Sequence, residues 1–354
     1  MAGDRKRLLI EVAAFLMVVA LIIVFTTRHR RREDGVPVEE RILMGTLVSV
    51  SVRDPGSCDA REAIDAAFAE IARVESLTTR YARDSEVIRL NEAWLDGASP
   101  ESSHLVSVSV DREVARLVAH SLLLSSVTGG AFDITVEPLV ELWSFGTDDF
   151  SVPSETEVAE AVALVGYERV LVDTAAATVA MPPGAGVDLD GVAKGYAVDR
   201  AMAVLRDLGV AAAVIDAGGD VRLLGQPLEL DNWRVGVMDP RSDGLMGVLS
   251  VPGGAVATSG DYQRFETVDG MRYHHILDPS SGYPARGVVS VTVLAGTCEE
   301  ADALATGVFV LGADAGMELV ENLKGVEALI VEGDGPVEAV RVSSGLTDRF
   351  ERLR

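Results

Sequence analysis

Cysteine and lysine are both scarce in this chain of 354 residues. The two cysteines, Cys58 and Cys298, lie far apart, which excludes a disulfide scaffold and a multi-cysteine zinc or iron–sulfur site. A single bridge between them is the one disulfide that the composition leaves open. The three lysines are Lys6, Lys194 and Lys324, so a lysine that lies inside a motif is easily noticed.

Positively charged residues are also few: the chain has 31 Lys and Arg but 55 Asp and Glu, which gives a net charge of −24. An acidic protein repels phosphate backbones, so we expect no nucleic-acid partner. Residues 1–35 depart from this pattern with seven basic and four acidic residues, a net charge of +3. Because 48% of the residues are apolar, the chain is not disordered and can bury a large core.

One long apolar run, residues 8–27, predicts a membrane anchor. Its twenty residues span about 30 Å as a helix, enough for the hydrocarbon core of a bilayer. The alternative is a cleaved signal peptide, but the run is long, ends in RHRRR and precedes no A-x-A cleavage site. No cysteine follows it directly, which argues against lipid attachment. Basic residues flank both ends, so charge alone does not set the orientation.

Residues 36–354 are predicted to form one globular domain after the anchor and its basic flanks, residues 1–35. Apolar residues at helical spacing predict helices over 60–77, 111–128, 193–208 and 297–311. Strand-like runs occur at 43–52, 210–215, between 233 and 293, and at 326–343. Because helices and strands do not alternate regularly, we expect an α+β fold with a largely antiparallel sheet rather than a doubly wound parallel one.

The stretch TCEEADALATGVFVLG, residues 297–312, predicts a helix that begins at a T-x-x-E capping box. Asp302 and Thr306 are four residues apart on it, so they project from one face about 6 Å apart. A carboxylate and a hydroxyl in this arrangement can share a hard cation such as Mg²⁺. The alternative is an ordinary helix whose early acidic residues are favoured by the helix dipole.

A second motif is VDLDGVAKGYAVDRA, residues 187–201. Asp188 and Asp190 precede Gly191, and a helix is expected to start near residue 192 with Lys194 in its first turn. Helix N-termini bind anions, and a lysine there adds charge for a phosphate. A Walker loop is absent from the sequence, and the alternative is a capped surface helix.

Two adjacent histidines mark a third motif, YHHILDPSSGYP at residues 273–284. Adjacent side chains in an extended segment point to opposite sides, so only one of His274 and His275 can face a given site. Histidine is the side chain best suited to act as a general base near neutral pH.

Three further stretches are polar or rich in glycine: GGAFDITVEP at 129–138, DAGGDV at 216–221, and ATSGDYQR at 257–264 with Ser259, Asp261 and Arg264. Each alone is more typical of a tight turn than of a site.

Taken together and in this order, the motifs resemble those of the ApbE family, the FAD:protein FMN transferases. The resemblance runs from about residue 44 to 312 and covers MGT, GAFD-x-T-x-x-P-L, DL-x-G-x-AKGY, GGD, TSGDY, HHI-x-DP-x-x-G-x-P and ADALAT. It implies an α+β core similar to the T-fold. It also implies Mg²⁺-dependent transfer of FMN from FAD to a threonine hydroxyl of a target protein, with release of AMP.

The resemblance further implies roles for individual residues. Positions that hold FAD are matched by Met44, Tyr81, Ala131, Phe132, Asp133, Asp188 and Lys194. His275 matches the catalytic histidine, which also lies against FAD. Asp302 and Thr306 match side-chain metal ligands, and Gly191 matches a ligand position through its carbonyl.

Many relatives carry a lipidated cysteine where this chain has an apolar helix, and both devices imply the extracytoplasmic face of the cell membrane. Family analogy points to an acceptor among flavin-bearing subunits of Rnf-type or sodium-translocating quinone reductases, or other membrane-linked electron carriers. Two alternatives stay open: hydrolysis of FAD to FMN and AMP, and flavin binding without turnover. Asp302, Thr306 and His275 argue against mere binding, because binding needs neither a metal nor a base.

Overall fold

The computed structural model describes residues 37–96, 104–226 and 231–353, so the predicted anchor and the whole of residues 1–35 lie outside the described residues. The described helices and strands all belong to a compact unit formed by residues 38–354.

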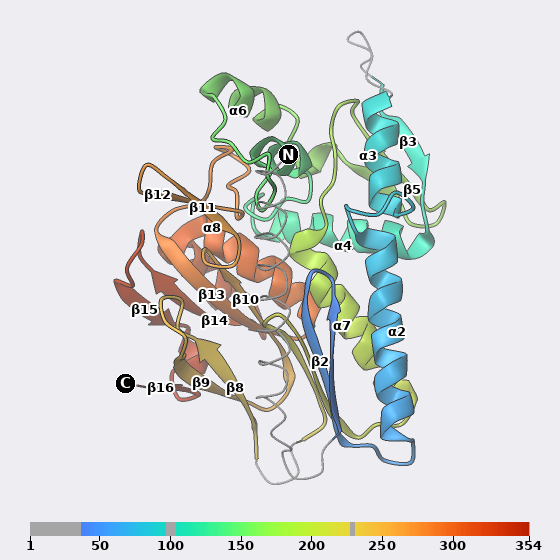
Figure 1. Cartoon of the computed structure of the whole chain (residues 1–354), viewed down its shortest axis with the longest axis vertical. Coiled ribbons are helices and arrows are strands. Elements are labelled where there is room, and N and C mark those ends of the chain that lie inside the picture. The colour runs from blue at the N-terminus through green and yellow to red at the C-terminus, as the bar shows by residue number, and fades with distance from the viewer. Residues whose placement is uncertain (1–36, 97–103, 227–230, 354) are drawn as a thin grey trace, which may run out of the picture. The chain divides into compact units, whose positions relative to one another are not determined.

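An eight-stranded sheet lies at the centre of this unit, and every pair of neighbouring strands in it is antiparallel (Figure 1). In spatial order the strands are β1 (Val38–Leu43), β2 (Thr46–Asp54), β6 (Ala212–Ala217), β7 (Asp220–Leu224), β10 (Gly254–Gly260), β13 (Val288–Ala295), β14 (Glu327–Glu332) and β15 (Ala339–Val342). The α+β fold with a largely antiparallel sheet is therefore confirmed.

Three long helices pack against the central sheet: α2 (Ala60–Thr78), α7 (Asp190–Asp207) and α8 (Cys298–Asn322). Their apolar stripes meet the strands in one core, and Ile64, Phe68 and Ile71 of α2 are all buried there, as their spacing predicts. Of the described helices, α8 is the one long and apolar enough to cross a membrane. Its packing against α7, β10 and β13 is that of a core helix.

A small antiparallel sheet forms a second core with residues of the central sheet. It consists of β16 (Phe350–Arg352), β9 (Leu245–Val251) and β8 (Trp233–Met238). All eight residues of β13 are consequently buried. A strand covered on both faces is expected to be continuously apolar, and VVSVTVLA nearly is.

A third core lies under the sheet β3 (Val106–Ser109), β5 (Thr178–Met181) and β4 (Leu171–Asp173), together with α3 (Glu86–Asp96) and α4 (Arg112–Val127). The helices α5 (Glu137–Trp143) and α6 (Glu155–Val162) enclose a smaller aromatic cluster. The hairpin β11 (Phe265–Val268) and β12 (Met271–His274) leads into the histidine motif.

Two predicted boundaries are wrong. The run 43–52 is not one strand, because Met44 and Gly45 have φ of 52° and 69° and form the two-residue turn between β1 and β2. The helix expected from residue 193 begins at Asp190, so Lys194 lies in its second turn. The predicted end of a helix at Gly312 is confirmed, because this residue is non-helical at φ 80°, and a second helical segment follows it as far as Asn322.

The expected capping box and one expected turn are also corrected. Thr297 accepts a hydrogen bond from the Glu300 N–H, but the reciprocal bond from the Glu300 side chain is not formed, so the box is half complete. Residues 257–260 belong to strand β10 and not to a turn, because they pair with β13 along the sheet.

Candidate functional site

A cavity of about 530 Å³ collects most of the residues that the sequence singled out. Of the eleven, ten line it: Tyr81, Ala131, Phe132, Asp133, Asp188, Gly191, Lys194, His275, Asp302 and Thr306. Met44 does not; it lines a second cavity of about 700 Å³, in which Lys194, Thr258, Gln263 and Arg264 also take part. The two cavities therefore share four wall residues.

The loop before α7 holds Asp188 in a fixed position. Its Oδ1 accepts a hydrogen bond from the Asp190 N–H at 2.7 Å, and its Oδ2 accepts one from Arg80 Nη1 at 2.7 Å. The negative charge of Asp188, together with burial, raises the pKa of Asp190 to about 6. Arg80 also lines the cavity and was missed in the sequence, because no local motif links it to a carboxylate 108 positions away.

Asp133 follows the end of α4, where Gly129 and Gly130 adopt φ of 62° and 87°. Its Oδ1 accepts from the N–H and the hydroxyl of Thr135, and its Oδ2 accepts from the Tyr167 N–H at 3.0 Å. Burial raises the pKa of this carboxyl. Asp133 thus fixes the loop that carries Ala131 and Phe132 in addition to lining the cavity.

Lys194 projects from the second turn of α7 between two carboxylates. It is ion-paired with Asp220 of β7, which is 1% exposed, and its Nζ lies 3.6 Å from Asp302 Oδ2. Burial disfavours the ammonium form, but the charges of Asp220 and Asp302 outweigh it and raise the pKa of Lys194. The sequence left open whether Lys194 binds a phosphate or an acid, and the structure shows the ion pair.

Asp302 and Thr306 project from α8 as their spacing predicts. The Gly195 N–H donates to Asp302 Oδ2 at 3.1 Å, and Thr306 Oγ1 lies 3.2 Å from Ser259 Oγ. Gly191 approaches them closely, since a Cβ at this position would lie 3.8 Å from Thr306 Oγ1 and 3.3 Å from the Phe132 ring.

The oxygens of Asp302, Thr306 and Gly191 are hard donors, which suit a hard cation. Within the described residues no three His, Cys, Asp or Glu side chains form a metal-binding group. A cation here would therefore rely on one carboxylate, one hydroxyl and a backbone carbonyl, all hard oxygen donors, with water completing the shell. That donor set fits Mg²⁺, which keeps several waters and few protein ligands.

The two histidines diverge as predicted. His275 lines the cavity, whereas His274 is 3% exposed, lies edge-on to the Phe309 ring and has its Nε2 2.9 Å from the Ala285 carbonyl. His275 Nδ1 lies 3.2 Å from the Arg264 carbonyl oxygen. A carbonyl only accepts, so we assign the proton of His275 to Nδ1 and the basic lone pair to Nε2. Burial, with the charge of Arg264, lowers its pKa to about 3.

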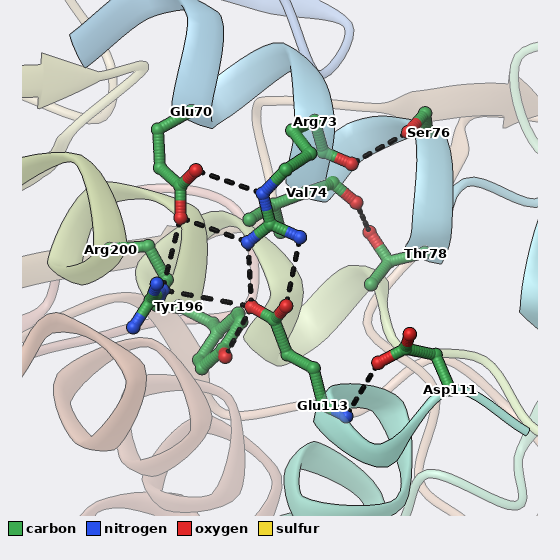
Figure 2. A network of polar contacts seen from close by, with 9 residues as sticks. All are labelled: Glu70, Arg73, Val74, Ser76, Thr78, Asp111, Glu113, Tyr196 and Arg200. Carbon is green, nitrogen blue, oxygen red and sulfur yellow. Dashed lines mark hydrogen bonds and ion pairs between the residues drawn. The ribbon is translucent and has the colours of Figure 1, made fainter. Parts of the chain in front are cut away.

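A polar network joins helices that lead to or carry residues of the cavity wall (Figure 2). Arg73 of α2 bonds both oxygens of Glu113 of α4 at 2.8 Å and also contacts Glu70. The Tyr196 hydroxyl of α7 donates to Glu113 at 2.7 Å, and Arg200 contacts Glu70 at 3.1 Å. Since α2 leads to Arg80, α4 to Ala131 and α7 carries Lys194, the network restrains their relative positions.

The fold is an antiparallel α+β core. One cavity in it brings together hard oxygen donors, the Lys194 ion pair and the neutral His275. These features define a candidate enzyme that acts on phosphate groups. The model of the ApbE family matches residues 44–330, and the chain belongs to that family. The resemblance inferred from the motifs is thereby confirmed.

Named relatives agree with this assignment. The chain is 33% identical over 306 residues to the FAD:protein FMN transferase of Haemophilus influenzae, covering 82% of this chain and 85% of the relative. It is 33% identical over 334 residues to that of Treponema pallidum, covering 88% of each. The crystal structure of an ApbE protein from Thermotoga maritima superposes with a TM-score of 0.79 at 36% identity, covering 90% of this chain and 100% of the other.

Proposed function

We propose that this chain is an FAD:protein FMN transferase, which moves FMN from FAD to a threonine hydroxyl of an acceptor protein and releases AMP. The observation that carries the proposal is the single cavity in which His275, Lys194, Asp302 and Thr306 meet, in a chain whose relatives bear that name. In the reaction the threonine oxygen forms a bond to the phosphorus of the FMN half. The bond from that phosphorus to the bridging oxygen breaks, and the electron pair leaves with AMP.

His275 is assigned the role of general base. Its neutral imidazole, with the proton on Nδ1, can accept the hydroxyl proton of the acceptor at Nε2. Mg²⁺ bound by Asp302, Thr306 and the Gly191 carbonyl would neutralise charge on the phosphate oxygens. Lys194 adds positive charge to the same wall and, through Asp220, stays in place without substrate.

FAD is assigned to the walls formed by Tyr81, Ala131, Phe132, Asp133 and Asp188, and reaches Met44 through the shared wall residues. Tyr81 is 75% exposed at this wall, so its ring is free to lie against a bound flavin. Arg80, which holds Asp188, extends the set beyond the residues taken from the motifs.

Incubation of the full chain with FAD, Mg²⁺ and a candidate acceptor tests the proposal. Covalent flavin on the acceptor, seen as in-gel fluorescence, together with AMP in equal amount, is the expected result. AMP release at full rate without acceptor would instead indicate FAD hydrolysis. FAD binding with no AMP in either case would indicate a flavin-binding protein.

The location belongs to the same proposal. Residues 8–27 anchor the chain as a single pass, with residues 36–354 on the extracytoplasmic face, where a flavin-bearing subunit of a Rnf-type or quinone-reductase complex is the acceptor we expect. A reporter fused to the C-terminus tests the orientation. Activity of a reporter that works only in the cytoplasm would reverse it.

A further inference from the structure

Hydroxyl groups in the helices of this protein usually bond to their own helix. Four buried ones donate to the carbonyl four residues earlier: Thr78 to Val74, Ser121 to Leu117, Ser125 to Ser121, and Thr128 to Leu124, at 2.8–3.0 Å. Thr306 of α8 differs. The one hydrogen-bond partner of its hydroxyl among the described residues is Ser259 Oγ of β10, at 3.2 Å.

The difference matters because a threonine hydroxyl has one proton and two lone pairs. A hydroxyl that binds a cation uses a lone pair and must direct its proton elsewhere. Ser259 of β10 offers an acceptor for that proton outside the helix. The Ser259 side chain is 9% exposed, so water does not readily take its place.

The neighbouring hydroxyl on the same strand does not duplicate this contact. Thr258 Oγ1 lies 2.9 Å from Thr292 Oγ1 of β13, the residue directly opposite it in the sheet. Because side chains alternate along a strand, Ser259 is the β10 hydroxyl that reaches α8.

We propose that Ser259 is a positioning residue for the metal site: it accepts the Thr306 proton and so keeps the Thr306 lone pairs directed at a hard divalent cation. The inference rests on the proposed function only in taking Asp302, Thr306 and the Gly191 carbonyl as the cation's protein ligands. Partners that orient a metal ligand typically contribute about 10- to 100-fold in metal affinity.

Mn²⁺ binding to the full chain in detergent, followed by the EPR signal of free Mn²⁺, tests this directly and without turnover. We expect Ser259→Ala to raise the Kd for Mn²⁺ by about tenfold. Because Ser259 also lines the cavity assigned to FAD, FAD affinity in the presence of EDTA is measured alongside, and we expect it to change less than the Kd for Mn²⁺ does. Ser121→Ala, which removes a buried hydroxyl of α4 that bonds within its own helix, is the matched control and should leave the Mn²⁺ Kd unchanged.

A double-mutant cycle separates positioning from a general structural effect. If Ser259 acts through Thr306, Ser259→Ala should alter the Kd by less than about twofold when Thr306 is already Val. A tenfold effect in both backgrounds, or none in either, overturns the inference. A failure of the proposed function gives a different result, in which the wild-type chain binds Mn²⁺ but transfers no flavin. A wild-type chain that binds no Mn²⁺ overturns the inference itself.

Discussion

The ammonium of Lys194 and the carboxylate of Asp220 form an ion pair that joins α7 to the central sheet at the wall of the cavity. The Asp220 side chain is 2% exposed and that of Lys194 is 26% exposed, so water screens the pair weakly. Lys194 also lies 3.6 Å from Asp302, which places one positive charge between two negative ones. The pair therefore connects the stability of the core to the candidate metal site.

Asp220→Asn should destabilise the protein, because it leaves the Lys194 ammonium buried with only the more distant Asp302 to balance it. Breaking a buried ion pair typically costs about 3–5 kcal/mol, and the remaining partner and partial exposure reduce this to about 2–3 kcal/mol. Urea unfolding monitored by circular dichroism measures the change. Asp314→Ala is the control, since Asp314 pairs with Arg341 while 91% exposed and should cost less than about 0.5 kcal/mol. Equal costs for the two variants would contradict the assignment.

Asp302→Ala should lower Mg²⁺-dependent flavin transfer by about a hundredfold, since a ligand that helps to neutralise phosphate charge is removed. Thr306→Val removes a neutral ligand and should reduce the rate less. Initial rates across an Mg²⁺ titration distinguish loss of metal affinity from loss of maximal rate. Near-normal rates for Asp302→Ala at ordinary Mg²⁺ concentrations would mean that Asp302 only stabilises its helix and the charge of Lys194, and binds no metal.

His275→Ala should abolish transfer while FAD still binds, because one base contributes about 10²- to 10⁴-fold and the binding contacts are spread over several loops. The matched variant is His274→Ala, whose side chain faces the Ala285 carbonyl and the Phe309 ring and does not line the cavity. It should lose stability but keep its activity per folded molecule. AMP release with acceptor present, alongside FAD titration, measures both. Full activity of His275→Ala would remove histidine from the mechanism.

Stability should fall on acidification because both histidines are held neutral. Burial is the main cause that lowers the pKa of His274 to about 4 and that of His275 to about 3. An unfolded histidine titrates near 6.5, so between that pH and about 4 the unfolded chain binds protons that the folded chain does not. Each histidine then contributes a slope of up to about 1.4 kcal/mol per pH unit, with stability rising as the pH rises.

Denaturant unfolding at several pH values between 4.5 and 7 compares the slopes, because this range lies mostly between the folded and unfolded pKa values of the two histidines. His275→Gln should reduce the slope relative to the wild-type chain. His104→Gln, at an exposed position, should leave it unchanged. The same slope in all three proteins would show that other groups cause the acid sensitivity.

The sequence by itself determined the family, the antiparallel α+β class and most of the secondary structure, because motifs and apolar spacing are local properties of the chain. The spacing of apolar residues alone predicts helix α2. The alternation of side chains in an extended segment alone predicts that His274 and His275 face opposite sides. The hairpin turn at Met44 was missed, because the apolar run continues through it and a non-glycine residue takes a positive φ.

What only the tertiary structure decided is which side chains meet. Arg80 bonds Asp188, Lys194 pairs with Asp220, and Ser259 reaches Thr306, across 108, 26 and 47 positions of the chain. Such pairs depend on the order of strands in the sheet and on how α7 and α8 pack against it. The spacing of apolar residues indicates only which face of one helix or strand a residue occupies. It therefore cannot identify the residue of another element that lies opposite.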